Sequence, residues 1–321
     1  MKKHRGKLVL LLVALIAWLE IAFYGYLQTD STQSNLTTVT IGYQKADPVD
    51  IARQRGELAK KMKAKGYKAV FKEFQDGTAL VTALKAGDID YARFGDTPPV
   101  TAQANGLKLA YIAAGASKEN GSGILVKKNS SISSLKDLKG KRIAYTKGTS
   151  AQFLIIQALK KAGLTTDDVT LVNMDQSASS VAFAKGKVDA WVTWDPYTAT
   201  AEVEQNAKLL VDGTGLSKNR DFLIATSSYA KAHTTVSKYL TSYLADDMQW
   251  ASSHQTQLVT MMSKTLHLSQ AVIKKQVARR TFSMGKVTSS IVKEQQKIAD
   301  TFYAAGLIDK KVNVKDALVD Q

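Results

Sequence analysis

The sequence contains no cysteine, which excludes disulfide bonds, thiol catalysis, cysteine-ligated metals and a thiol-linked lipid anchor. Histidine is also scarce: the four histidines are scattered, and none has the HExxH spacing of a zinc site. The GxSxG, GxxxxGKS/T and GxGxxG motifs of common enzyme families are missing as well. We therefore expect a protein that is not an enzyme and has no cofactor or metal.

Acidic residues are few relative to basic ones, with 28 Asp and Glu against 44 Lys and Arg, a formal net charge of +16. Such an excess can indicate nucleic-acid binding. Here, however, the lysines are dispersed along predicted helices, as in Lys60, Lys61, Lys63 and Lys65, without interleaved aromatic residues. We expect solvated helix faces and no nucleic-acid partner. A positive field would suit an anionic cell surface or an anionic ligand.

The first 27 residues have the composition of a targeting segment. A basic stretch precedes 12 apolar residues from Leu8 to Leu19, and the apolar character continues after Glu20 to Tyr26. The whole stretch is long enough to span a membrane, and no cleavage site is obvious, so a cleaved signal and a retained anchor both stay open. We predict export to the outer face of the cytoplasmic membrane, anchored or released at the cell surface or in the periplasm. Residues 28–37 would form a flexible tether.

An internal repeat is the most informative pattern in the chain. The segment from Lys85 to Pro98 recurs 99 positions later, aligning Gly87 with Gly186, Asp90 with Asp189 and Asp96 with Asp195. Each copy has the pattern of a helix end, a glycine turn, a short strand, and an Asp followed by Pro before the next helix. This repeat predicts two similar α/β lobes, and two such lobes would enclose a ligand-binding cleft.

Alternating helices and strands continue over both halves of the chain. In the first half we expect strands at 38–43, 68–74, 89–94 and 109–114 and helices at 48–65, 78–86 and 97–105. In the second half we expect strands at 142–145, 169–173 and 188–193 and helices at 151–162, 177–184 and 196–204. This order predicts parallel sheets covered on both faces.

Two short apolar segments, 123–127 and 221–226, are expected to be crossover strands between the lobes. Beyond Tyr229 the pattern is helical, and we assign this part to lobe one. The predicted division is therefore 38–125 and 225–321 for lobe one and 126–224 for lobe two.

Ligands of open parallel sheets bind beyond the carboxyl ends of the strands, beside helix N-termini. Tyr43-Gln44, the segment from Gly95 to Pro99 and the segment from Lys147 to Ser150 occupy such places. The hydroxyls of Thr149 and Ser150 could bind an oxyanion, or simply cap the next helix.

Trp194-Asp195-Pro196-Tyr197 suits a small ligand with an apolar body or a cationic end. The alternative is core packing by Trp191 and Trp194 and a helix cap by Asp195. Asp96 and Asp195 could instead act as an acid/base pair, in which case the protein would be an enzyme. Helix caps or ligand contacts explain both residues more simply.

Together these motifs resemble the solute-binding proteins of aliphatic sulfonate ABC transporters, a superfamily that includes taurine- and nitrate-binding proteins. The resemblance covers about Thr38 to Leu307, and it is carried by the following segments: Ile41-Gly42-Tyr43-Gln44, Ala86 to Asp90, Gly95 to Val100, Lys147 to Ala151, Val188 to Trp191, Trp194 to Tyr197, and Ala278-Arg279-Arg280. It implies the type II periplasmic-binding-protein fold, with two lobes joined by two crossover strands and a helical C-terminal region on lobe one.

The resemblance also implies a function and a site. A monomeric protein would capture an alkanesulfonate between the lobes and deliver it to the ABC permease for sulfur uptake. The residues carried over are Gln44, Asp96 and Thr97 from lobe one, Thr149, Ser150, Trp194 and Asp195 from lobe two, and Arg280 as a further contact to the anion. Taurine, nitrate or a thiamine-precursor pyrimidine are alternative ligands, and a surface protein that binds anionic polymers is an alternative of another class. Many Gram-positive relatives are anchored through a lipidated cysteine. Because this chain has no cysteine, we expect it to be tethered by its apolar N-terminal segment, released, or associated with the permease by contact alone.

Overall fold

The computed structural model describes residues 18, 20, 36–75 and 77–319 of the chain. The predicted targeting segment, residues 1–27, and the predicted tether, residues 28–37, lie outside the described residues except for Trp18, Glu20, Leu36 and Thr37. Within the described part, no helix is both long enough and apolar enough to cross a membrane.

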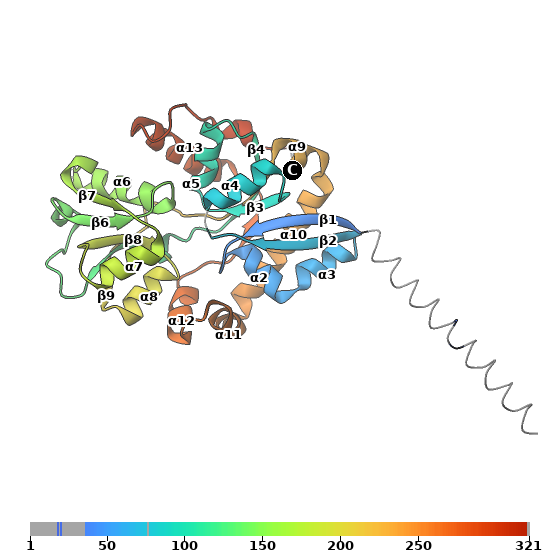
Figure 1. The fold of residues 1–321 in the computed structure, drawn as a ribbon, viewed down its shortest axis with the longest axis horizontal. Coiled ribbons are helices and arrows are strands. Elements are labelled where there is room, and N and C mark those ends of the chain that lie inside the picture. Colours follow the sequence, from blue (N-terminus) through green and yellow to red (C-terminus); the bar gives the residue numbers. More distant parts are fainter. Residues whose placement is uncertain (1–17, 19, 21–35, 76, 320–321) are drawn as a thin grey trace, which may run out of the picture.

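The chain folds into two lobes, each built on one β-sheet (Figure 1). The strands of lobe one, in the order β11-β4-β10-β3-β1-β2, are Met284–Gly285, Leu109–Gly115, Phe222–Thr226, Tyr91–Phe94, Thr37–Tyr43 and Tyr67–Glu73. Those of lobe two, in the order β7-β6-β8-β5-β9, are Thr170–Asn173, Arg142–Tyr145, Ala190–Trp194, Ser122–Lys127 and Ala207–Asp212. Apolar side chains from both faces of each sheet join separate buried clusters, so both faces are covered.

The helices follow the strands as the sequence predicts, with one exception. The first half contains α2 (Pro48–Arg55), α3 (Glu57–Lys63), α4 (Gly77–Ala86) and α5 (Thr97–Ala104), and lobe two contains α6 (Ser150–Ala162), α7 (Gln176–Ala184) and α8 (Tyr197–Glu204). The prediction of a single helix over 48–65 is wrong, because Gly56 adopts a left-handed conformation with φ of 75° and separates α2 from α3.

The remaining helices are C-terminal: α9 (Ser227–Ala232), α10 (Thr234–Ser253), α11 (Gln255–Leu266), α12 (Gln270–Ala278) and α13 (Ser289–Ala304). Helix α10 packs on α2 and α3, and α13 packs on α5, so this region covers lobe one. Helix α12 differs, since it also contacts α8 of lobe two.

Both sheets are mixed, which corrects the prediction of wholly parallel sheets. Strand β10 lies antiparallel between β3 and β4, and β5 lies antiparallel between β8 and β9. Each of these strands enters its sheet from the other lobe and therefore runs against its neighbours. Strand β9 was not predicted.

The division predicted at 125/126 and 224/225 falls inside β5 and β10. The chain passes between the sheets over residues 116–121 and 213–221. We therefore propose that the lobe boundaries lie in these two passages.

The repeat has a structural counterpart in each lobe. Gly87 and Gly186 both turn the chain with positive φ, at 79° and 65°. The carboxylate of Asp90 then accepts a hydrogen bond from the Thr40 N–H at 2.7 Å, and that of Asp189 accepts one from the Arg142 N–H at 2.8 Å. Each aspartate thus ties the start of its strand to the neighbouring parallel strand, which aligns the strand ends that carry Asp96 and Asp195.

Candidate functional site

The two lobes are in contact on two flanks of their junction. On one flank, Lys275 of α12 pairs with Glu202 of α8 at 3.3 Å. On the other, Gln157 of α6 donates to Thr301 of α13 at 3.2 Å, and Phe153 of α6 packs into an apolar cluster of lobe one. The lobes are therefore in direct contact on both flanks, and the ends of β1, β3 and β8 face the junction.

A buried cluster of charges occupies this junction. Three cations surround Asp221, which is 1% exposed: Lys118 Nζ lies 2.6 Å from Asp221 Oδ1, Arg280 Nη2 lies 3.3 Å from Oδ2, and Arg93 also forms an ion pair with it. Arg93 is further 3.6 Å from Asp47, the N-cap residue of α2. Asp96 also interacts with Lys118 and Arg93, so three cations and three carboxylates lie together at this junction.

Burial shifts the pKa values of the cluster in the direction that favours the uncharged form of each residue. It lowers the pKa of Lys118 well below the usual value, assisted by Arg93 and Arg280, whose own pKa values fall to about 10 through burial. Burial likewise raises the pKa of Asp47 to about 6, against the opposing effect of Arg93. An anion near the three cations would stabilise their charged forms.

The predicted residue Gln44 belongs to this cluster. Its Oε1 accepts a hydrogen bond from Arg93 Nη1 at 3.0 Å, and its amide nitrogen donates to the Gln75 carbonyl at 3.1 Å. Arg280, predicted as a contact to the anion, also lies here and donates from Nη1 to the Ala46 carbonyl at 3.1 Å. The structure thus places both Gln44 and Arg280 in the charge cluster.

Asp96 and Thr97 are buried at the start of α5. The Thr97 hydroxyl, 0% exposed, donates to Asp96 Oδ1 at 3.0 Å, so its proton is already used. Gln295 of α13 donates to the Asp96 carbonyl at 2.7 Å. Burial raises the pKa of Asp96 to about 6, although Thr97 and Lys118 lower it.

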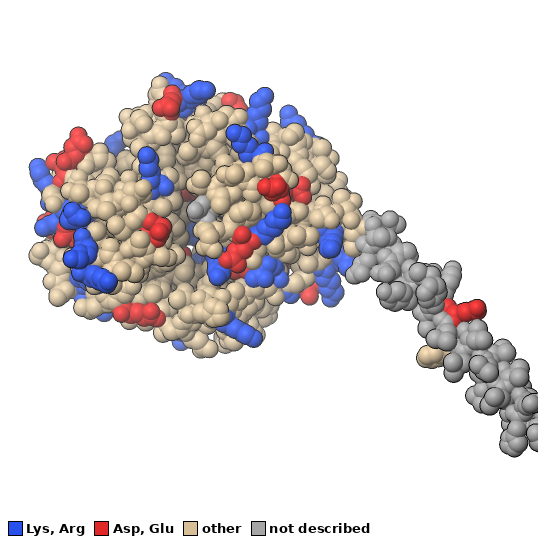
Figure 2. Space-filling view, in the orientation of Figure 1, with Lys and Arg blue, Asp and Glu red and all other residues tan. Residues whose placement is uncertain are grey.

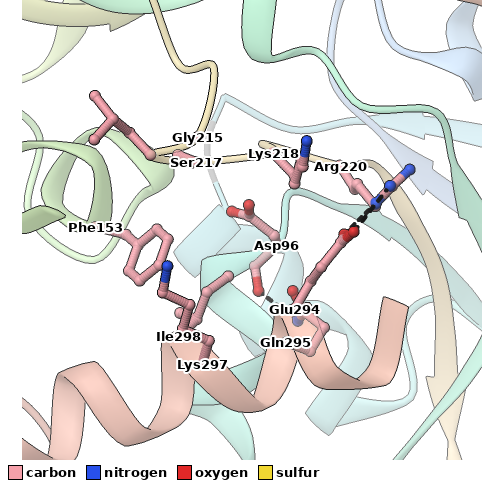
Figure 3. Close-up of a pocket in the computed structure, with 11 residues that line it drawn as sticks. Asp96, Phe153, Gly215, Ser217, Lys218, Arg220, Glu294, Gln295, Lys297 and Ile298 are labelled. Carbon is pink, nitrogen blue, oxygen red and sulfur yellow. Dashed lines mark hydrogen bonds and ion pairs between the residues drawn. The ribbon is translucent and has the colours of Figure 1, made fainter. Parts of the chain in front are cut away.

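The Asp96 carboxylate borders a small apolar cavity of about 130 Å³ between the lobes. Figure 3 shows it pointing into the space between Phe153 of α6 and Ser217 and Lys218 of the second passage. Ile298 of α13 closes another side. The cavity therefore lies between elements of both lobes, beside the charge cluster.

The N-terminus of α6 is the contribution of lobe two. Thr149 is its N-cap, as the alternative reading predicts: its Oγ accepts from the Ala151 N–H at 3.3 Å and donates to the Thr146 carbonyl at 2.7 Å. Ser150 is 8% exposed, and its hydroxyl forms no hydrogen bond with any residue that the structure describes. Ser150 therefore retains a donor beside the positive end of the helix dipole.

Trp191 packs in the core, fully buried beside Phe183 and Tyr197, which confirms its structural reading. Trp194 is half-buried and packs on the apolar cluster of lobe two. It sits at the end of β8, where the strand reaches the junction.

The Asp195 carboxylate is engaged by the protein itself. It accepts from the Ala199 N–H at 3.0 Å, which confirms the helix-cap reading, and from Arg279 Nε at 2.8 Å. Arg279 also contacts Glu202 at 2.7 Å, so this residue at the end of α12 binds two acids of lobe two. Asp195 therefore joins the two lobes.

Sequence reasoning missed Arg93, Lys118 and Asp221. One signal was present: Arg93 is the only charged residue of the four-residue strand Tyr91–Phe94, and a charge in such a strand needs a buried partner. No comparable signal marks Lys118 or Asp221, because both lie in the irregular passages between the lobes. Among the described residues, no group of His, Asp and Glu is arranged to hold a metal ion.

Comparison with known proteins gives consistent matches. A family described as NMT1/THI5 like matches residues 63–258. A protein of Escherichia coli (strain K12) named for the binding of aliphatic sulfonates is 31% identical over 289 residues, which cover 90% of each chain.

Two solved structures share the fold. The periplasmic aliphatic sulphonate binding protein SsuA from Escherichia coli has a TM-score of 0.83 and 31% identity, covering 88% of this chain and 92% of that one. The alkanesulfonate-binding protein SsuA from Xanthomonas axonopodis pv. citri, bound to MOPS, has a TM-score of 0.82 and 33% identity, covering 88% and 98%. They confirm the predicted type II periplasmic-binding-protein fold, and the matched relatives are binding proteins, not enzymes.

Proposed function

Because the chain belongs to the SsuA-like aliphatic sulfonate-binding proteins of the NMT1/THI5-like family, we propose that it captures organic sulfonates for an ABC permease. The observation that carries this proposal is the buried cluster of Arg93, Lys118 and Arg280, which brings three cationic donors to the junction between the lobes. As its relative is periplasmic, we place the protein outside the cytoplasmic membrane.

The sulfonate would bind between this cluster and the N-terminus of α6. Arg280, Lys118 and Gln44 would face it from one side, and the Ser150 hydroxyl at the start of α6 would face it from the other. A ligand that contacts both lobes stabilises the closed state, because it gains these contacts only on closure. The closed state is the form that a permease would receive.

The carbon chain of the ligand would occupy apolar space beside the cluster. The cavity between Phe153 and Ile298 is small, which favours short chains, and Trp194 would flank the chain as the resemblance implies. Taurine is the second candidate, because the Asp96 carboxylate points into the same space and would pair with an amine. Asp195 is a weaker partner for an amine, since Arg279 already neutralises it.

The test is calorimetry on residues 31–321 with ethanesulfonate, hexanesulfonate, MOPS, taurine and nitrate. Buffers must be free of sulfonates, which excludes MES, HEPES and MOPS itself. Micromolar or tighter binding of an alkanesulfonate supports the proposal, and a preference for taurine identifies the alternative. Binding of nitrate alone, or of none of the five, contradicts it.

Ser150 offers a specific prediction for the site. Changing Ser150 to alanine should weaken sulfonate binding by about tenfold, since one hydrogen bond to a charged group is lost. The free energy of unfolding should hardly change, because the hydroxyl has no partner in the ligand-free protein. Thr149→Ala is the matched control: it removes the helix cap and should cost about 1 kcal/mol of stability. Equal affinity of Ser150→Ala and the unaltered protein would remove Ser150 from the site.

Affinity should also depend on pH. The pKa values of Asp47 and Asp96 are raised to about 6, so both carboxylates become neutral as the pH falls through 6. Neutralisation removes negative charge beside a sulfonate that stays ionised, and affinity should therefore rise between pH 7.5 and 5.5, by up to about 25-fold for each carboxyl. Calorimetry at the two pH values checks this, and Asp96→Asn should flatten the dependence. An affinity that falls on acidification contradicts the assignment.

A further inference from the structure

The chain enters lobe one at an end that is rich in unpaired lysines. The Thr37 N–H donates to the Gly66 carbonyl at 3.0 Å, which places the start of β1 beside the turn that follows α3. Lys63, Lys65 and Lys68 surround this turn, are exposed, and have no carboxylate partner among the described residues. Figure 2 shows Lys and Arg side chains at this end of the molecule, as well as on other parts of the same face.

Three tyrosines, one on β2 and two on α10, lie beside these lysines. Lys65 Nζ is 5.7 Å from the ring of Tyr239, which contacts the rings of Tyr67 and Tyr243 at 6.4 and 5.8 Å. These rings are half-buried. Lysine beside half-buried tyrosine is the combination that proteins place at a membrane surface, where the charge reaches the headgroups and the ring sits just below them.

A basic groove continues the surface along the N-terminal half of α10. It encloses about 750 Å³, and the residues that line it include Lys231, Lys238 and Lys286 together with the hydroxyl side chains of Thr234 and Thr241. No acidic residue is among the described residues that line it. Strand β10 runs antiparallel to β3 and β1, so the start of α10 lies at the same end of the sheet as the start of β1. The groove and the lysines around the Gly66 turn therefore belong to one basic end of lobe one.

The position of the apolar N-terminal stretch is what points to a membrane. Ten residues, 27–36, separate Tyr26 from Thr37. Fully extended, they span at most about 35 Å. If residues 8–26 enter a bilayer, this end of lobe one is held next to the lipid headgroups, and the opposite end of the molecule is not (Figure 1).

We propose that the basic end, defined by Lys63, Lys65, Lys68 and Lys238, docks on anionic phospholipid headgroups of the membrane that residues 8–26 enter. The groove beside Lys238 accommodates a headgroup. Docking holds the protein on the bilayer between rounds of ligand delivery. Docking of the basic end depends on the predicted membrane segment and not on which ligand the cleft binds.

The test uses the full chain and exploits its lack of cysteine. A single cysteine in place of the exposed Ala64 carries a bimane fluorophore, and a nitroxide on a few lipid headgroups quenches it only at short range. Vesicles contain either 30% phosphatidylglycerol in phosphatidylcholine or phosphatidylcholine alone. We expect strong quenching on the anionic vesicles at 50 mM NaCl, and its loss at 500 mM NaCl.

Matched charge variants identify the surface. Changing Lys63, Lys65, Lys68 and Lys238 to glutamine should abolish quenching. Each lost lysine should lower the equilibrium constant for docking by about fivefold. The same change at Lys160, Lys161, Lys185 and Lys187, on lobe two, should leave it intact. Equal quenching on both vesicle types, unchanged quenching in the first variant, or no association of the chain with vesicles would each overturn the proposal.

Discussion

Replacing Asp221 with alanine is expected to lower the free energy of unfolding by about 3–5 kcal/mol. Asp221 is 1% exposed and pairs with Arg93, Lys118 and Arg280. Without it, three buried cations lose their shared counter-charge and keep only Asp47 and Asp96 nearby. The cost of a buried charge without a partner exceeds the value of the ion pair itself, so the effect should be large. Urea unfolding followed by tryptophan fluorescence measures it.

Asp246→Ala is the matched control for this prediction. Asp246 also pairs with a lysine, Lys61, at 2.7 Å, but both side chains are about half exposed, at 49% and 40%. Water screens such a pair, and its loss should change the stability by less than about 1 kcal/mol. If Asp221→Ala is as mild as Asp246→Ala, water reaches the cations, and the account of a dry charge cluster is wrong.

Replacing Arg280 with methionine should have the largest effect on ligand binding, a loss of about 10–100-fold. Methionine retains most of the side-chain volume and its contact with the Phe282 ring, over which the guanidinium lies at 4.9 Å. The change reduces the cluster from three cations to two, against the three carboxylates of Asp47, Asp96 and Asp221. The negative charges of the site then exceed the positive ones, and the anion also loses a charged hydrogen-bond donor, worth about 1.5–3 kcal/mol.

Two further variants make this prediction specific. Arg280→Lys keeps the charge but loses the planar donor pair, so its affinity should be intermediate. Arg142→Met removes an exposed arginine of lobe two and should bind the ligand normally. Calorimetry with the preferred alkanesulfonate compares the three, and normal affinity of Arg280→Met would show that Arg280 serves only the structure of the junction.

The repeating elements of this fold are largely predictable from the chain. Helix and strand follow from local periodicity, and most boundaries agree within two residues. Sheet order does not follow, because β10 is placed between β3 and β4 by pairing over more than 100 residues. The helix break at Gly56 was also missed, because glycine is tolerated inside helices and its presence alone does not show that α2 ends there.

The candidate site was predictable in location but not in its partners. Strand ends identified Gln44, Asp96, Ser150 and Asp195 as lying near the junction. Which charges pair there depends on the distant segments that closure brings together. Arg279 and Asp195, for example, are 84 positions apart in the chain.

The placement of β10 has a consequence for the order in which the protein acquires its structure. Strands β4 and β11 connect to β3, β1 and β2 only through β10, so the sheet of lobe one stays in two pieces until residue 226 is available. Lobe two is continuous from residue 122 to residue 212 and needs nothing that follows it. A chain that emerges N-terminus first can therefore complete its second lobe before its first. Until then the open edges of β3 and β4 are available for pairing with other chains, which makes late synthesis and export the stage most exposed to aggregation.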